Sequence, residues 1–143
     1  VDDVCESQIV QCDAHKVSLD VVIPDGLRIR GERFLIRHAF ANVLQNAIEF
    51  SSEGSVVRIT GQQQADGCVS IFVDDSGPGI PLYATERVFE RFFSLQRPRT
   101  GKKSSGLGLA IAAETAELHG GHISLCNRDD GGARAALIFP AAS

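Results

Sequence analysis

The spacing of apolar residues changes along the chain, and each spacing predicts a different element. Between Glu32 and Phe50 apolar residues recur every three or four positions, which predicts an amphipathic helix of about five turns. Shorter helices are expected at 83–93 and, between flanking glycines, at 106–121. Runs rich in β-branched residues predict a hairpin-like strand pair at 17–31 and further strands at 55–64, 68–75, 122–128 and 133–139.

Length and composition allow one compact α/β domain. The chain has 143 residues, of which 43% are hydrophobic and 22% are charged, enough to build a core. It contains no run of about 18 apolar residues and no leader-like opening, so we expect neither a membrane span nor a signal peptide within it. The valine start and the absence of methionine fit a fragment of a longer protein. The four cysteines match no zinc or disulfide spacing and are expected to be buried or half-buried thiols in a reducing compartment.

Charge is unevenly distributed. The net charge of −4 gives no general reason to expect a nucleic-acid partner. Residues 94–105 are rich in Pro, Gly, Ser and charge without periodicity, which predicts a long mobile loop. The basic residues in and beside this loop are Arg91, Arg97, Arg99, Lys102 and Lys103.

One face of the long helix carries polar groups. Helical geometry places His38, Asn42, Asn46 and Glu49 in one narrow stripe opposite the apolar stripe, so both asparagines are expected to face outward. An asparagine carbonyl oxygen is a neutral hard ligand that suits Mg²⁺. The spacing alone is equally typical of an ordinary solvated helix face.

Two glycine motifs add ligand chemistry. In DDSGPGIP (74–81), glycines follow a strand that ends in two acids, so the backbone can turn sharply and approach a flat ligand. An aspartate fixed there can accept a hydrogen bond from an exocyclic amine such as that of adenine. In SSGLGLAIA (104–112), a helix starts directly after the glycines, and its free N–H groups favour phosphate. Either motif alone is usually only a turn.

In this order the motifs resemble the catalytic, ATP-binding domain of sensor histidine kinases, within the larger group that includes gyrase, Hsp90 and MutL (HATPase_c, GHKL). The resemblance runs from about residue 16 to residue 140, and within the family it is strongest to CreC-type kinases. The matching segments are the N box HAFANVLQNAIEFS (38–51), the first glycine box DDSGPGI (74–80), the F box FERFF (89–93), the second glycine box SSGLGLAIA (104–112) and the closing strand GGARAALIFP (131–140). Ala133 stands in that strand where threonine is usual.

The resemblance implies a fold. This is a Bergerat-type α/β (α+β) two-layer sandwich, in which a mixed sheet of about five strands is covered on one face by about three helices. The nucleotide would lie between the long helix and the basic loop, which would be the ATP lid. Residues 1–15 would be a helical segment continuing from an absent dimerisation domain, and 16–143 would be the catalytic ATP-binding domain.

The resemblance also implies residue roles. Asn46 would bind the magnesium that bridges the ATP phosphates, with Asn42 supporting metal or phosphate. Asp75 would bind the adenine amine, Phe50 would lie against adenine, and Asp74 would be structural. The other implied nucleotide contacts are Gly77, Gly79, Ile80, Gly106, Leu107, Gly108, Leu109, Arg91, Arg97, Arg99, Lys102 and Lys103, and the residues counted as catalytic are Asn42, Asn46 and Arg91.

Two departures from the family pattern bear on the reaction. Glu49 stands where many members have lysine, and a carboxylate there would repel phosphate unless it points away or a lid arginine compensates. Asn42 stands where the hydrolytic relatives have a glutamate that activates water, so direct hydrolysis should be slow. The family's phosphoacceptor histidine precedes an acid, and none of His15, His38, His119 and His122 does.

We therefore expect a protein-histidine kinase domain that binds Mg-ATP. It would transfer the γ-phosphoryl group to a histidine on a separate dimerisation domain, for relay to a response regulator in a two-component system. The intact protein would be a homodimer anchored in the inner membrane, with this domain on the cytoplasmic side. Two alternatives remain open: an ATPase of the gyrase, Hsp90 or MutL kind, and a nucleotide-sensing module without transfer activity.

Overall fold

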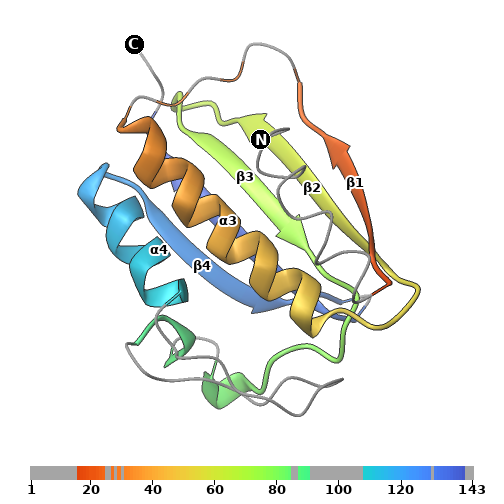
Figure 1. The fold of residues 1–143 in the computed structure, drawn as a ribbon. Helices are drawn as coiled ribbons and strands as arrows, with labels where there is room; N and C mark the ends of the chain where they lie inside the picture. Colours follow the sequence, from red (N-terminus) through yellow and green to blue (C-terminus); the bar gives the residue numbers. More distant parts are fainter. Residues whose placement is uncertain are drawn as a thin grey trace.

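The computed structural model describes residues 16–24, 27, 29, 31–84, 87–90, 108–129 and 131–140. Within them, five strands form one sheet that is accompanied by two α-helices and two short 3-10 helices (Figure 1). In chain order these are β1 (Ser18–Val22), α3 (Arg33–Phe50), β2 (Val56–Gln63), β3 (Val69–Asp74), η1 (Leu82–Ala84), η2 (Arg87–Phe89), α4 (Gly108–Leu118), β4 (His122–Asn127) and β5 (Ala133–Phe139).

The sheet is mixed, with strand order β1-β2-β3-β5-β4. β1 pairs with β2 in parallel, whereas the other neighbours are antiparallel. α3 and α4 lie side by side across one face of the sheet (Figure 1). This arrangement confirms the expected two-layer sandwich with its helices on one face.

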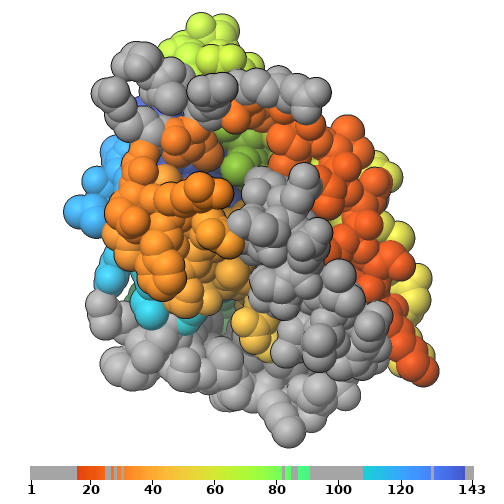
Figure 2. All heavy atoms as spheres, turned by 45° about the horizontal axis from the view of Figure 1, so that its top comes forward, coloured from red at the N-terminus to blue at the C-terminus, as the bar shows by residue number. Residues whose placement is uncertain are grey.

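The long helix begins and ends where the sequence predicts. The side chain of Glu32 caps its first turn by accepting hydrogen bonds from the backbone N–H groups of Phe34 and Leu35, at 3.2 and 2.7 Å. At the other end, the Ser51 hydroxyl donates to the Ala47 carbonyl over 2.8 Å. The outer side of α3 forms an exposed ridge in Figure 2, whereas its apolar stripe is buried against the sheet.

The core has two parts that meet beside the carboxyl end of α3. The larger cluster joins α3, α4 and the inner face of the sheet, through residues such as Leu44, Ile48 and Leu137. The smaller cluster consists of Phe50, Ile80, Ala84, Val88 and Ala133. Through this cluster, the segment after the first glycine motif packs against the end of α3. The two clusters therefore lie on either side of the predicted nucleotide region.

The hairpin predicted at 17–31 is described only in part. Its described residues contain one strand, β1, which pairs in parallel with β2 from residue 56 onward, a partner that the sequence did not predict. Ile29 is a single bridge residue among the described positions 27, 29 and 31. Alternation within a short apolar run predicts a strand but does not specify its partner.

In its described part, the helix predicted at 83–93 was wrong in kind. The described part of this segment forms two 3-10 turns, η1 and η2, with Val88 buried. Each 3-10 helix spans only three residues, so helical spacing over this stretch reflects short turns. The described part of the chain thus has two α-helices where about three were expected.

Other predictions fall partly or wholly outside the described residues. These include the helical segment 1–15, the loop 94–105, and Cys5 and Cys12. Cys68 and Cys126 are described and both are free thiols; Cys68 is half-buried, whereas Cys126 is exposed, so the expectation of burial was wrong for Cys126. No helix in the described ranges is long and apolar enough to cross a membrane.

Candidate functional site

A pocket opens between α3 and the inner face of the sheet. Its walls are mainly aliphatic, and its two polar side chains are Asn46, from α3, and Asp75, just after β3. The lining residues are Val43, Asn46, Ala47, Val73, Asp75, Phe89, Leu109, Ile123, Leu125 and Ala135. An apolar slot with few polar groups is typical of a site for a flat organic ligand.

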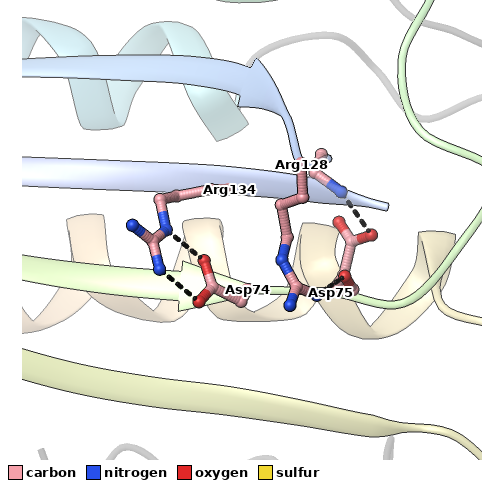
Figure 3. Close-up of polar contacts among 5 residues, drawn as sticks. Asp74, Asp75, Arg128 and Arg134 are labelled. Carbon is pink, nitrogen blue, oxygen red and sulfur yellow. Dashed lines mark hydrogen bonds and ion pairs between the residues drawn. The ribbon is translucent and has the colours of Figure 1, made fainter. Parts of the chain in front are cut away.

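Asp75 is held in the pocket wall by backbone groups. Its Oδ1 atom accepts hydrogen bonds from the N–H groups of Gly77 (3.1 Å) and Ala133 (3.0 Å). Its own N–H donates to the Ala133 carbonyl over 2.9 Å, and its carbonyl accepts from Arg128 Nη1 over 2.9 Å (Figure 3). Both carboxylate bonds end on Oδ1, so Oδ2 accepts none from the described residues.

Burial controls the acidity of this carboxyl group. Desolvation raises the pKa of Asp75 above its ordinary value, although the N–H groups of Gly77 and Ala133 and the charge of Arg128 act in the opposite direction. A nearly buried carboxylate with a raised pKa in a pocket is typical of a functional site. It offers a fixed hydrogen-bond acceptor in apolar surroundings.

Asp74 has a different environment. Its carboxylate forms a two-point ion pair with Arg134 on β5, with distances of 2.7 and 2.9 Å (Figure 3). The Arg134 guanidinium also lies over the Phe72 ring, 4.7 Å from its centroid. This pair links β3 to β5, which agrees with the structural role expected for Asp74.

The first glycine motif has the backbone geometry that its glycines predict. A Cβ on Gly77 would overlap the carbonyl oxygen of Phe50, so a larger residue does not fit there. Gly79 has φ +85°, in the left-handed region that favours glycine. The turn therefore depends on both glycines.

The two asparagines of α3 lie one turn apart and have different neighbours. Asn46 lines the pocket, and both residues are only half-exposed. Asn42 faces the start of α4, where a Cβ on Gly108 would lie 3.6 Å from its Cγ. Its Nδ2 atom is buried without a hydrogen-bond partner in the part of the chain that the structure describes. The expectation that both asparagines face outward was therefore wrong for the amide nitrogen of Asn42, because the start of α4 lies against this side chain.

Other predicted site residues are distributed around the pocket. Leu109 lines it, whereas Phe50 and Ile80 are buried in the adjoining small cluster. His38 is exposed and stacks on Phe34, with ring centroids 6.2 Å apart. The predicted residues that lie outside the described part are Arg91, Arg97, Arg99, Lys102, Lys103, Gly106 and Leu107.

Sequence reasoning missed three residues of this region. Phe89 was assigned only to the F box, yet it lines the pocket. Asn127 and Arg128, at the end of β4, hydrogen-bond to the backbone on either side of the first glycine motif. Their position just before a double glycine was the one available signal, because it marks a tight turn at the carboxyl end of a strand.

Comparisons with known proteins agree with this geometry. A family model described as "Histidine kinase-, DNA gyrase B-, and HSP90-like ATPase" (HATPase_c) matches residues 31–143. The sensor protein CreC of Escherichia coli (strain K12) is 40% identical over 134 residues, which cover 94% of this chain and 28% of CreC. This similarity confirms the resemblance to sensor histidine kinases of the CreC type, and the chain spans under a third of that relative's length.

Solved structures of histidine kinases have the same fold as this chain. A nucleotide-free catalytic domain of the histidine kinase ThkA superposes with a TM-score of 0.84 at 26% identity, covering 99% of this chain and 92% of that one. Full-length ShkA in complex with AMPPNP superposes with a TM-score of 0.82 at 25% identity, covering 99% of this chain and 29% of that one. Sequence, fold and pocket together show that the chain belongs to the histidine kinase-, DNA gyrase B- and HSP90-like ATPase family.

Proposed function

We propose that the chain is the catalytic domain of a sensor histidine kinase and binds Mg-ATP in the pocket between α3 and the sheet. The observation that carries this proposal is the placement of Asp75, whose Oδ1 is occupied by two backbone N–H groups while the residue lines an apolar slot. Oδ2 is then available to accept a hydrogen bond from the adenine amine. The apolar walls would enclose the base.

The residues on α3 fit the polar end of such a ligand. Asn46 offers an amide oxygen, a hard neutral ligand of the kind that Mg²⁺ takes when phosphates supply its other contacts. The Nδ2 of Asn42 is a buried donor that has no hydrogen-bond partner among the described residues, which suits a phosphate oxygen. When bound, the metal would neutralise phosphate charge during transfer. Gly108, at the start of α4, would bring helix N–H groups toward the same phosphates.

Transfer fits the residues better than hydrolysis. Asn42 has no basic group with which to activate water, so the phosphoryl group needs another nucleophile. His119 is occupied within the fold, because its Nε2 accepts from the Glu32 N–H and its Nδ1 donates to the Thr115 carbonyl. We therefore propose that the acceptor is a histidine on a separate dimerisation domain, from which the phosphoryl group passes to a response regulator.

The remaining expectations concern the longer protein. We propose that residues 1–15 lead from the dimerisation domain into a catalytic domain at 16–143. We also propose that the lid cations Arg91, Arg97, Arg99, Lys102 and Lys103 contact the phosphates, with Gly106 and Leu107 shaping that side of the site. The intact protein would act as a membrane-anchored homodimer that holds this domain in the cytoplasm.

A phosphotransfer assay tests the proposal. The chain is mixed with γ-labelled ATP, Mg²⁺ and the separately produced dimerisation domain, and acid-labile phosphohistidine is measured on that domain. We expect labelling that disappears in Asp75→Asn and when the acceptor histidine is replaced by glutamine. Steady phosphate release without the acceptor would instead support an ATPase of the gyrase, Hsp90 or MutL kind. Nucleotide binding without labelling would support the other alternative, a nucleotide-sensing module without transfer activity. Glu49 is the only sequence feature that favours it.

A further inference from the structure

We propose that Asn127 is a positioning residue that sets the base selectivity of the pocket from outside it. Its side-chain amide forms two hydrogen bonds with the backbone of Ile80: Oδ1 accepts from the Ile80 N–H, and Nδ2 donates to the Ile80 carbonyl, each over 2.7 Å. The residues are 47 positions apart. This two-point contact, the Asn127 clamp, fixes the far end of the turn that begins at Asp75.

Gly79 and Asn127 fit together sterically. A Cβ added to Gly79 would lie 2.7 Å from Asn127 Oδ1, closer than real Cβ contacts allow. The glycine at this position therefore serves two purposes, since its positive φ shapes the turn and its missing side chain leaves room for the amide. If Gly79 were needed only for its backbone conformation, no side chain would have to occupy the space next to its Cα, yet the Asn127 amide does.

The near end of the same turn is held by the same hairpin. Arg128 donates to the Asp75 carbonyl, the Asp75 N–H donates to the Ala133 carbonyl, and the Ala133 N–H donates to Asp75 Oδ1. The connection between β4 and β5 is itself closed by hydrogen bonds from the Arg128 N–H to the Gly132 carbonyl (2.9 Å) and from the Gly131 N–H to the Arg128 carbonyl (3.2 Å). Residues 75–80 are thus fixed at both ends to one tight hairpin.

This arrangement links Asn127 to the Asp75 carboxylate. The Gly77 N–H that holds Oδ1 belongs to the turn between the two fixed ends, so freeing Ile80 loosens a group that orients the carboxylate. A misoriented Oδ2 would distinguish poorly between an amine and a carbonyl on the purine. The inference rests on the proposed function, because it assumes that Asp75 reads the base.

The experiment compares ADP with IDP, whose base carries a carbonyl in place of the exocyclic amine. Binding of both to the 143-residue chain is measured by calorimetry with Mg²⁺, for wild type, Asn127→Ala and Asn127→Asp. Asn127→Asp keeps the side-chain size and lacks the donor, so a folded variant is available if the alanine variant does not fold. Gln64→Ala is the matched control, because it also removes a side-chain amide bond (to Ser70, 2.9 Å) at the opposite end of β3.

We expect both Asn127 variants to lower the ratio of ADP affinity to IDP affinity by about three- to tenfold, since a charge-assisted hydrogen bond is partly lost. The Ile80 amide should exchange with solvent faster in Asn127→Ala, which loses the Oδ1 acceptor, and Gln64→Ala should change neither quantity. A merely structural Asn127 would weaken both nucleotides equally, and an unchanged ratio overturns the inference alone. Wild type that binds neither nucleotide would overturn the proposed function and the inference with it.

Discussion

Asp74 and Asp75 are adjacent in the chain, yet their carboxylates have separate environments. Asp74 forms a two-point ion pair with Arg134, whereas Asp75 accepts hydrogen bonds from the backbone of Gly77 and Ala133 beside the pocket. Side chains alternate along β3, and Val73 and Asp75 both line the pocket. Asp74 therefore links neighbouring strands, whereas Asp75 faces the ligand pocket. Loss of the Asp74 ion pair should reduce stability, and loss of the Asp75 carboxylate should reduce nucleotide binding.

Removing the Asp74 partner should reduce stability. The Asp74 side chain is 5% exposed and that of Arg134 is 44% exposed, so Arg134→Ala leaves a buried carboxylate uncompensated. We expect the free energy of unfolding to fall by about 2–3 kcal/mol. This is at or below the smallest loss expected when a fully buried ion pair is broken, because Arg134 is partly exposed. Chemical denaturation measures it.

Arg87→Ala is the matched control, because Arg87 forms an ion pair with Glu90 outside the sheet, with side chains 57% and 58% exposed. An exposed pair of this kind should contribute about 0–1 kcal/mol. Equal losses for the two arginine variants would contradict the assignment of Asp74 as a structural acid.

Glycine substitutions should separate steric overlap from backbone strain. A Cβ on Gly77 would overlap the Phe50 carbonyl, and we expect Gly77→Ala to lower the free energy of unfolding by at least about 3 kcal/mol. Gly54 has φ +79° with open space around it, so Gly54→Ala should cost only about 1–2 kcal/mol. Thermal and urea unfolding measure both, and a milder effect at Gly77 than at Gly54 would contradict the geometry of the turn.

Nucleotide affinity should depend on pH through Asp75. Burial raises the pKa of Asp75 in the folded state above the ordinary 3.8, so the folded chain binds this proton more tightly than the unfolded chain does. The resulting stabilisation is present below the ordinary pKa and is lost as pH rises through the folded-state pKa. ADP binding has the opposite trend, because it needs the ionised acceptor.

We therefore expect ADP affinity to fall on acidification, starting above the ordinary pKa of an aspartate. Calorimetry between about pH 4 and pH 8 measures this, with circular dichroism to confirm that the chain stays folded. Asp75→Asn is the control and should show a weaker pH dependence. An affinity that holds down to the ordinary pKa in wild type would argue against Asp75 as the base-reading group.

The effect of Mg²⁺ on nucleotide affinity should depend on Asn46. We expect a non-hydrolysable ATP analogue to bind wild type more tightly with Mg²⁺ than with a chelator, and Asn46→Ala to lose most of that difference. ADP and ATP-analogue titrations with and without Mg²⁺ provide the measurement. A full Mg²⁺ effect in Asn46→Ala would assign the metal to other groups.

Much of this domain could be predicted from sequence, for identifiable reasons. The periodicity of α3 and the glycine turn after β3 are local patterns, and both were correct to within a residue or two. The pairing of β1 with β2 was missed because strand partners are set by long-range contacts. Asn127 was missed for the same reason, since nothing near it in sequence shows that it hydrogen-bonds to Ile80, 47 positions away.

The buried side-chain nitrogen of Asn42 shows a further limit of prediction from sequence. A helical stripe identifies residues that share a face, but it does not show whether another helix covers that face, as α4 does. That its side-chain donor has no partner in the described part of the chain could be found only from the packed structure. It is now a specific reason to expect phosphate near the start of α4.

The most direct test of the central claim is a calorimetric titration of the chain with ADP and Mg²⁺, comparing wild type with Asp75→Asn. The asparagine keeps an Oδ1 acceptor for Gly77 and Ala133 but can place an amide donor against the adenine amine. We predict micromolar binding to wild type, roughly −8 kcal/mol, and affinity weaker by about 10- to 100-fold in the variant. Equal affinity in the two folded proteins, or no binding to wild type, would contradict the assignment of this pocket as an adenine-nucleotide site read by Asp75.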